Sequence, residues 1–498
     1  MSGIFRAPCI VLRASVILIH EARSTKKTQD FENNQINNWN MKSLFRTKSI
    51  ESIIKNAEKT HFKKTLGALD LILLGVGCTI GTGIFVLTGV AAAEHAGPGI
   101  ALSYLLSGIV CMFAGLAYTE LASTVPISGS AYTYSYAVLG EFVAWLVACG
   151  LVLEYTVAAS TVSAGWSGYF VGILKQGGIE LPEKFTTVPS QGGIVNLPAI
   201  CIALFVGLLL YRGTRESIIV NRILVGLKLI VIFIFLIVAT PEIKMENYAE
   251  FLPFGWHGVL TGAAAIFFAY LGFDAVATTA EECKNPRRDL PIGIIGGLAI
   301  CAVLYVAVSL VLTGISHYST LSNAEPMARA LRENGSNIGS ALVGTGAVAG
   351  MVTVLLVMMY AQTRIFVAMS RDGLIPSFFG KLHEKYATPH ISCIIVTLVV
   401  MLISGFTPIK TMGHMSSLGT LFAFCVVSIG VVALRLQRPD LHRTFRCPAV
   451  FFVAPIAVIS CGYLILTLLS ETYKPFFIWF AIGLVVYFAY SRKRSFLS

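Results

Sequence analysis

One short stretch of this sequence, TIGTGIFVL at residues 79–87, places two glycines in the middle of a long apolar run. Gly81 and Gly83 flank Thr82, where a stable helix favours residues such as alanine or leucine. Because each interior glycine costs a helix about 1 kcal/mol relative to alanine, the stretch predicts a broken helix. Small residues also let membrane helices pack closely, so a packing role is the alternative.

A second stretch, FFAYLGFDAVATTAEE at residues 267–282, is interrupted at Gly272 and Asp274. Paired interruptions in corresponding helices of two halves are the sequence sign of a transporter with its site near the middle of the membrane. N–H groups freed at a half-helix start suit a carboxylate, and freed carbonyls suit an ammonium group. Two facing breaks therefore favour an α-amino acid. Asp274 is expected to cap the half-helix that follows, with ligand contact as the alternative.

The elements that must position these breaks are membrane helices. The chain has 498 residues, 55% hydrophobic and 13% charged, and its mean hydropathy is +0.76. Runs of 18 or more mostly apolar residues recur from about residue 67 onward, and each can cross a hydrocarbon core of about 30 Å. Backbone groups in lipid must be satisfied internally, which requires helices. We predict an all-α polytopic membrane protein with twelve spans, near 67–92, 98–123, 140–171, 194–211, 217–240, 257–280, 290–314, 340–369, 390–407, 414–435, 449–469 and 475–491.

The distribution of basic residues predicts the orientation of these spans. With the N-terminus inside, the inner segments carry 23 Lys and Arg and the outer loops carry seven. This bias predicts that both termini are cytoplasmic. It also accounts for the net charge of +11 without nucleic acid as a partner. The eleven cysteines lie mostly within spans and lack the spacing of a disulfide framework or metal site, so we expect no metal.

The predicted organisation follows from the spans. A cytoplasmic segment, 1–64, precedes transmembrane repeat one at 65–240 and repeat two at 257–435. Two peripheral helices at 449–491 and a cytoplasmic tail at 492–498 complete the chain. Residues 1–40 fit poorly with the remainder: either translation starts at Met41, or these residues form a cytoplasmic tail.

Four longer motifs carry a resemblance to a known family. They are GALDLILLGVGCTIGTGIFVLTG, TELASTVPISGSAYTYSYAVLGE, FFAYLGFDAVATTAEECKNPRRDLPIGI and QTRIFVAMSRDGLIP. In this order they resemble the amino acid/polyamine/organocation superfamily, and most closely the bacterial members of its cationic amino acid transporter family. The resemblance runs from about Phe45 through the last span. It implies a leucine-transporter-type fold, a 5+5 inverted repeat plus two peripheral helices.

The resemblance also implies a substrate site at the two breaks. It places the carboxylate-binding amides at Gly81, Thr82 and Gly83. It places the amine-binding carbonyls at Thr79, Ile80, Phe268, Ala269 and Leu271. Phe268 also matches the aromatic residue that closes over bound substrate. Met358 matches a position that shapes the side-chain pocket, and an ordinary lipid- or core-facing methionine is the alternative.

Placing an ionisable residue inside a membrane span costs free energy, so its presence there indicates a role in function. Lys228 lies twelve residues into the fifth span, and the resemblance places it where sodium-coupled relatives hold an ion. A protonatable amine there suggests proton coupling, and a structural lysine paired with carbonyls is the alternative. Glu154, midway along the third span, is expected either in the side-chain pocket or in a structural role. Glu120 and Glu141 lie at span ends and are expected to be solvated.

We expect a proton-coupled symporter that takes up α-amino acids by alternating access in the plasma (bacterial inner) membrane, with lipid and small-molecule substrate as its partners and no cofactor. Glu154 would suit a cationic substrate, whereas the small apolar character around Met358 favours neutral amino acids such as alanine. The alternatives are an amino acid exchanger, a polyamine or amine transporter on the same fold, and a nutrient-sensing receptor. No HExxH or Gly-x-Gly-Asp element appears in any span, so an intramembrane enzyme is not expected.

Overall fold

Apolar helices form most of the regular structure of this chain. The computed structural model describes residues 45–49, 64–125, 130–213, 218–386 and 388–496. Every element named below belongs to the unit Thr47–Ser498, and of the other unit, Met1–Arg46, only residues 45 and 46 are described. The expectations for residues 1–40 and for a start at Met41 lie outside the described residues.

The described residues contain nine helical segments that are long and apolar enough to cross a membrane. Three shorter apolar helices accompany them: α3 (Ala68–Thr79), α8 (Leu197–Arg212) and α15 (His390–Phe406). Among the residues described, extended pairing is represented by an isolated bridge between Leu66 and Cys283. The expected all-α class is therefore observed.

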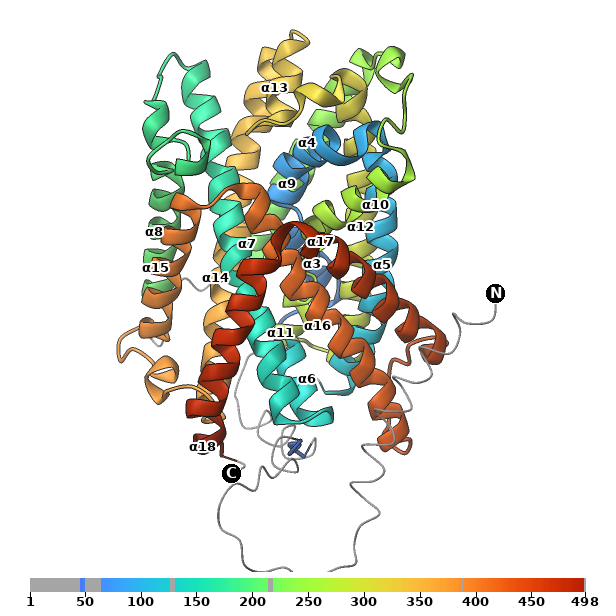
Figure 1. Cartoon of the computed structure of the whole chain (residues 1–498), viewed down its shortest axis with the longest axis vertical. Helices are drawn as coiled ribbons and strands as arrows, with labels where there is room; N and C mark the ends of the chain where they lie inside the picture. Colours follow the sequence, from blue (N-terminus) through green and yellow to red (C-terminus); the bar gives the residue numbers. More distant parts are fainter. Residues whose placement is uncertain (1–44, 50–63, 126–129, 214–217, 387, 497–498) are drawn as a thin grey trace, which may run out of the picture. The chain divides into compact units, whose positions relative to one another are not determined.

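The first expected break separates two half-helices (Figure 1). α3 ends where Ile80 takes an extended backbone, with φ −75° and ψ 100°. The chain resumes as the π-helical segment η2 (Gly83–Leu87) and continues through α4 (Thr88–Ala91) and η3 (Ala92–Ala96). The interruption thus lies at the glycine pair that the sequence singles out.

The second break has a similar form. α10 (Gly255–Ile266) passes into the 3₁₀ segment η9 (Phe267–Tyr270), and Leu271 is extended, with φ −64° and ψ 148°. Gly272 follows with φ +104°, a left-handed value that glycine adopts without strain. The helix restarts only briefly, as α11 (Ala275–Thr278). The glycine is therefore required by the backbone path of the break.

Four long helices enclose the breaks. They are α5 (Ile100–Thr124), α7 (Glu141–Gln176), α12 (Pro286–Ile315) and α14 (Asn337–Arg371). α12 packs against both α3 and α5, and α14 packs against α7. The broken segments are thereby buried in protein, which is where irregular backbone at membrane depth is tolerated.

Helical spacing sorts the residues of α9 (Ile218–Ala239) onto two faces. The exposed stripe contains Ile223, Leu227, Ile230, Phe233 and Ile237. The buried stripe contains Val225, Lys228, Ile232, Phe235 and Ala239. Steps of three and four residues keep each set on one side of a helix. Lys228 therefore faces the protein interior, where α9 packs against α3 and α14.

The remaining helices complete the bundle. They are α6 (Ser130–Val138), α13 (Pro326–Glu333), α16 (Ile409–Gln437), α17 (Val450–Val486) and α18 (Arg492–Arg494). α17 contains a kink at Thr472, with φ −133° and ψ 29°, three residues before Pro475. This kink divides the helix between the last two expected spans.

Two carboxylates expected to be solvated are instead buried. Glu120 accepts hydrogen bonds from the guanidinium of Arg435 at 2.9 and 2.6 Å. Glu141 accepts hydrogen bonds from the hydroxyls of Tyr136 and Tyr487 at 3.0 and 3.2 Å. The expectation was wrong because Arg435 and Tyr487 lie hundreds of residues along the chain from the acids that they contact. A burial of this kind is invisible in the local sequence.

Candidate functional site

A small cavity lies between the two breaks. Its lining comprises Cys78, Thr79, Gly81, Thr82 and Gly83 from the first break, Phe268 and Leu271 from the second, Ala158 and Val162 from α7, and Val354 and Met358 from α14. Seven of the residues predicted from the sequence therefore meet around one space. The residues contributed by α7 and α14 are all apolar.

The two breaks touch each other at a glycine. A Cβ atom added to Gly83 would overlap the Cα atom of Ala269 and lie 2.6 Å from its Cβ atom. Gly81 is less constrained, since its Cβ would lie 3.2 Å from a methyl group of Val354. Close approach of the two backbones thus depends on glycine at position 83. This glycine serves packing and lines the cavity at the same time.

The hydroxyl of Tyr305 links the two breaks. Its oxygen lies 2.9 Å from the carbonyl oxygen of Thr79 and 2.8 Å from that of Ala269, so its single proton is shared between them. Both carbonyls were predicted to bind the substrate amine. In this structure Tyr305, which is buried in α12, occupies them. A bound ammonium group would have to share or displace this contact.

A second tyrosine holds the half-helix that follows the first break. The hydroxyl of Tyr104 donates to the carbonyl of Gly83 at 3.2 Å and lies 2.6 Å from the hydroxyl of Thr88. The rings of Tyr104 and Tyr305 have centroids 5.3 Å apart. We did not predict either tyrosine. The available signal was a phenol inside an apolar span, because its polar tip needs a buried partner.

The start of η2 provides the features expected of a carboxylate site. The N–H groups of Gly81, Thr82 and Gly83 lie at the N-terminus of a helix. At this position a helix has no carbonyl of a preceding turn to accept their hydrogen bonds. The side chain of Thr82 points elsewhere and donates to the sulfur of Met351 at 3.3 Å. The three residues thus line the cavity at the end of the half-helix that carries the positive end of its dipole.

Lys228 lies beside the first break but not on the cavity lining described above. Its amino group donates to the carbonyl of Gly77 at 2.6 Å, and the residue is fully buried. A Cβ on Gly350 of α14 would lie 2.9 Å from Cγ of Lys228. The lysine stem therefore passes between α14 and α3, and its charge-bearing end contacts α3 near its broken end.

Glu154 lies away from the cavity, close to Asp274. The two carboxylates interact electrostatically, and Asp274 accepts a hydrogen bond from the hydroxyl of Tyr155. Among the described residues, neither carboxylate oxygen of Glu154 has a hydrogen-bond partner, nor does Oδ1 of Asp274. Asp274 immediately precedes α11, but its side chain makes no capping hydrogen bond to that helix, so the expected capping role is not observed. Ile80, Ala269, Lys228 and Glu154 are thus the predicted site residues that do not line the cavity as described.

Comparison with known proteins shows what this chain is similar to. The family model described as amino acid permease matches residues 66–488. A methylthioribose transporter of Bacillus subtilis (strain 168) is 44% identical, over 92% of this chain and 100% of the relative. The branched-chain amino acid permease BcaP of the same organism is 45% identical, over 91% and 98%. Cationic amino acid transporter 9, chloroplastic, of Arabidopsis thaliana is 39% identical, over 79% and 71%.

Proposed function

Because this chain belongs to the amino acid permease family, whose members are integral membrane transporters and not enzymes, we propose that it takes up neutral, apolar α-amino acids with protons. We place it in the plasma membrane with both termini cytoplasmic. Twelve spans would form a leucine-transporter-type 5+5 inverted repeat, 65–240 and 257–435, with peripheral helices at 449–491. Alternating access would expose the site to each side in turn.

The observation that carries this proposal is the meeting of both breaks around one cavity. The amides of Gly81, Thr82 and Gly83 offer a half-helix N-terminus to a carboxylate. Carbonyls of the two breaks, which Tyr305 already bridges, offer acceptors to an ammonium group. Amides from the first break and carbonyls from both breaks together complement the two charges of a zwitterion.

The chemistry of the side-chain wall supports a neutral substrate. Ala158, Val162, Val354 and Met358 present apolar surface to the cavity. Glu154, the acid expected to meet a cationic side chain, is not among the described lining residues. A relative of 45% identity is named for branched-chain amino acids, which have apolar side chains. An aliphatic amino acid therefore fits this wall better than arginine or a polyamine.

The contact of Lys228 with Gly77 supports proton coupling. An ammonium group donates to a carbonyl, whereas a neutral amine binds it more weakly. Gain and loss of a proton on Lys228 would therefore strengthen and weaken the attachment of α3 to α9. Coupling requires a different proton affinity in the outward and inward states, because a ligand with equal affinity for both shifts nothing.

A second candidate substrate comes from the relative named as a methylthioribose transporter, at 44% identity. Methylthioribose is a thioether sugar with neither a carboxylate nor an ammonium group. It would use the apolar wall around Met358 but not the charges of the two breaks. An amino acid exchanger on the same fold is a third possibility, since the same cavity would serve it.

Uptake into proteoliposomes tests these functions together. Labelled L-leucine, L-alanine, L-arginine and methylthioribose should be compared with and without an inward proton gradient. We expect leucine or alanine to accumulate only with the gradient. Accumulation of methylthioribose alone would replace the amino acid proposal. Exchange of leucine for internal leucine, with no response to the gradient, would identify an exchanger.

A further inference from the structure

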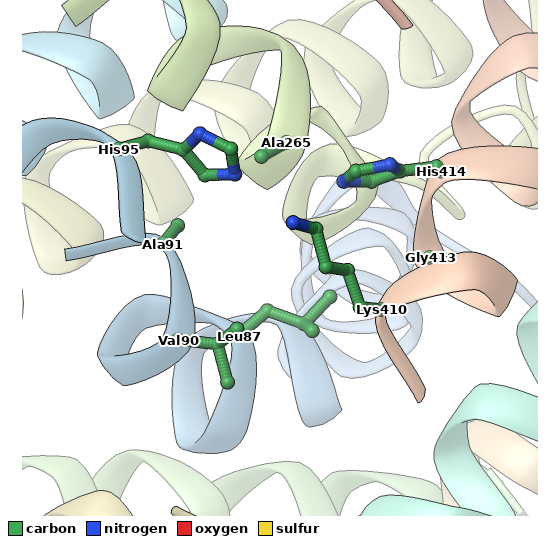
Figure 2. Close-up of a pocket in the computed structure, with 8 residues that line it drawn as sticks. All are labelled: Leu87, Val90, Ala91, His95, Ala265, Lys410, Gly413 and His414. Atoms are coloured by element: carbon green, nitrogen blue, oxygen red, sulfur yellow. The ribbon is translucent and has the colours of Figure 1, made fainter. Parts of the chain in front are cut away.

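The two sides of the substrate cavity are covered in different ways. On one side a second cavity lies between η3 and α16, where Figure 2 shows the amino group of Lys410 and the imidazoles of His95 and His414 pointing into one space. On the other side, where Figure 1 shows α6 and α18, the chain beyond α17 lies against the turn that follows α14. The hydroxyl of Ser491 donates there to the carbonyl of Leu374 at 2.6 Å. In the proposed orientation this second side is cytoplasmic.

Residues 491–496, which we call the strap, cross the turn after α14 in backbone contact with it. The N–H of Phe496 donates to the carbonyl of Asp372 at 3.2 Å. A Cβ atom on the next residue, Gly373, would lie 2.4 Å from the carbonyl oxygen of Arg494. Gly373 also has φ +77°, a value that glycine adopts without strain. The strap therefore fits on this turn only because residue 373 has no side chain.

The strap also binds a buried carboxylate at the start of α7. Glu141 is 2% exposed. It accepts hydrogen bonds from three hydroxyls, those of Tyr136 in α6, Tyr487 in η13 (Tyr487–Ser491) and Ser495 in the strap. Hydrogen bonds to a carboxylate are stronger than those between neutral groups, and a buried acid without donors is costly. The strap thus supplies one of the donors that keep Glu141 inside the protein.

α6 connects these contacts to the second break. Its residue Tyr136 contacts Glu141, and Tyr132, one turn earlier, donates to the carboxylate of Asp372 at 2.6 Å. The same helix packs against α11, the short helix that follows Gly272. A movement of α11 would therefore be passed to α6. Because α6 shares Glu141 and Asp372 with the strap, the strap restrains the cytoplasmic side of the second break.

We propose that the strap holds the cytoplasmic side of the transporter closed and leaves Gly373 and Glu141 when that side opens, so that it controls the rate of substrate release. The inference rests on the proposed function. The cavity is closed in this structure, since Thr79, Phe268 and Met358 in its lining are 5%, 6% and 2% exposed. When the strap leaves, water replaces its hydroxyl at Glu141. The carboxylate is then never left without a donor, and the strap can return.

Hydrogen exchange of the purified full-length protein tests this restraint. Gly373→Ala places a methyl group against the backbone of Arg494 and should displace the strap. Gly178→Ala is the matched control, because Gly178 has φ +80° and no atom lies within 4 Å of an added Cβ. We expect amides of α6 and α11 to exchange about tenfold faster in Gly373→Ala than in Gly178→Ala, which corresponds to the loss of a strong hydrogen bond. Amides of α8 should exchange equally in both.

Ser495→Ala is a milder variant that removes only the hydroxyl that contacts Glu141. It should accelerate exchange in the same two helices and raise the initial rate of L-leucine counterflow in proteoliposomes by about threefold, because the cytoplasmic side opens more often. Ser322→Ala removes a serine that donates to Glu94 at 3.4 Å on an exposed loop, and it should change neither property.

Three results would overturn the role of the strap. They are equal exchange of α6 and α11 in Gly373→Ala and Gly178→Ala, unchanged counterflow in Ser495→Ala, and faster exchange throughout the chain, α8 included, in both strap variants. The last result would mean that the strap only stabilises the fold. Absence of leucine counterflow in the wild-type protein would instead overturn the proposed function, and hydrogen exchange would still decide whether the strap restrains α6 and α11.

Discussion

The amino group of Lys228 in α9 donates to the backbone carbonyl of Gly77 in α3 at 2.6 Å. Gly77 lies three residues before Ile80, where the first helix breaks. This hydrogen bond connects a buried ionisable group to the backbone beside the proposed substrate site. Because a charge at this depth is costly, a lysine retained there is expected to act in transport.

Replacing Lys228 tests this connection. Lys228→Met keeps the unbranched apolar stem, one atom shorter, but cannot carry a proton, so accumulation driven by a pH gradient should be lost. Equilibrative exchange of leucine should persist, and added sodium should not restore accumulation. Lys244→Met, at an exposed position, is the matched control and should accumulate leucine normally. If Lys228→Met still concentrated leucine with the wild-type pH dependence, the proton would use another route, with Glu154 the next residue to replace.

Tyr305→Phe removes the hydroxyl that bridges the two breaks and leaves the ring in place. We expect the free energy of unfolding in detergent to fall by about 1 kcal/mol, which is the net contribution of a typical hydrogen bond. Leucine uptake should fall as well, because the carbonyls of Thr79 and Ala269 lose their common partner. Tyr463→Phe alters an exposed tyrosine and should change neither property. Equal stability of the two variants would mean that the bridge is not maintained in solution.

Gly83→Ala should reduce stability and leucine binding much more than Gly81→Ala. The added methyl group at position 83 meets the backbone of Ala269, which cannot move aside as a side chain can. We expect Gly83→Ala to lose about 2 kcal/mol of stability, within the range for overpacking, together with leucine binding. The added methyl group in Gly81→Ala meets the side chain of Val354 and no backbone atom among its three nearest neighbours, so the loss of stability should be smaller.

The double variant Gly83→Ala with Ala269→Gly provides a further check on this contact. It removes the Cβ of Ala269 but not the Cα atom, so recovery should be partial at most. Unfolding curves and leucine binding measured on the same preparations would report both effects. Full recovery would show that the two backbones are farther apart than in this structure.

Met358 should control the size of the side-chain subsite. Its terminal methyl group would lie 3.0 Å from a Cβ on Gly272, so the side chain fills space between α14 and the second break. Met358→Ser should therefore admit L-arginine, while Met358→Leu, which keeps the volume, should retain the wild-type profile. Competition by a panel of amino acids against labelled leucine measures this change. An unchanged profile in Met358→Ser would place residue 358 outside the path of the substrate side chain.

The breaks could be predicted because they need unusual residues at particular places. Glycines and Asp274 within apolar runs are costly in uninterrupted helices, so the local sequence carried the signal. The placement of Lys228 on a buried face also follows from the spacing of its apolar neighbours along α9. The family resemblance supplied the detailed roles at each break.

Contacts between distant helices could not be predicted in the same way. Tyr305 reaches two carbonyls that lie 226 and 36 residues away along the chain. Glu154 lies one helical turn before Ala158, which lines the cavity, and approaches Asp274 after the second break, a neighbour that the sequence of α7 does not reveal. Glu120 is at a helix end, and its burial depends on Arg435 in α16.

The central claim is that the paired breaks recognise the two charges of a zwitterion, and binding to the purified full-length protein tests it most directly. Labelled L-leucine should be displaced by unlabelled leucine, leucine methyl ester, isopentylamine and methylthioribose in parallel titrations. The ester lacks the free carboxylate, the amine lacks the carboxylate entirely, and methylthioribose lacks both charges. The account predicts displacement by leucine at concentrations at least about tenfold lower than by the ester or the amine and at least about 100-fold lower than by methylthioribose, since each lost charged contact costs about 1.5–3 kcal/mol. Displacement by methylthioribose or isopentylamine at concentrations equal to leucine would contradict it.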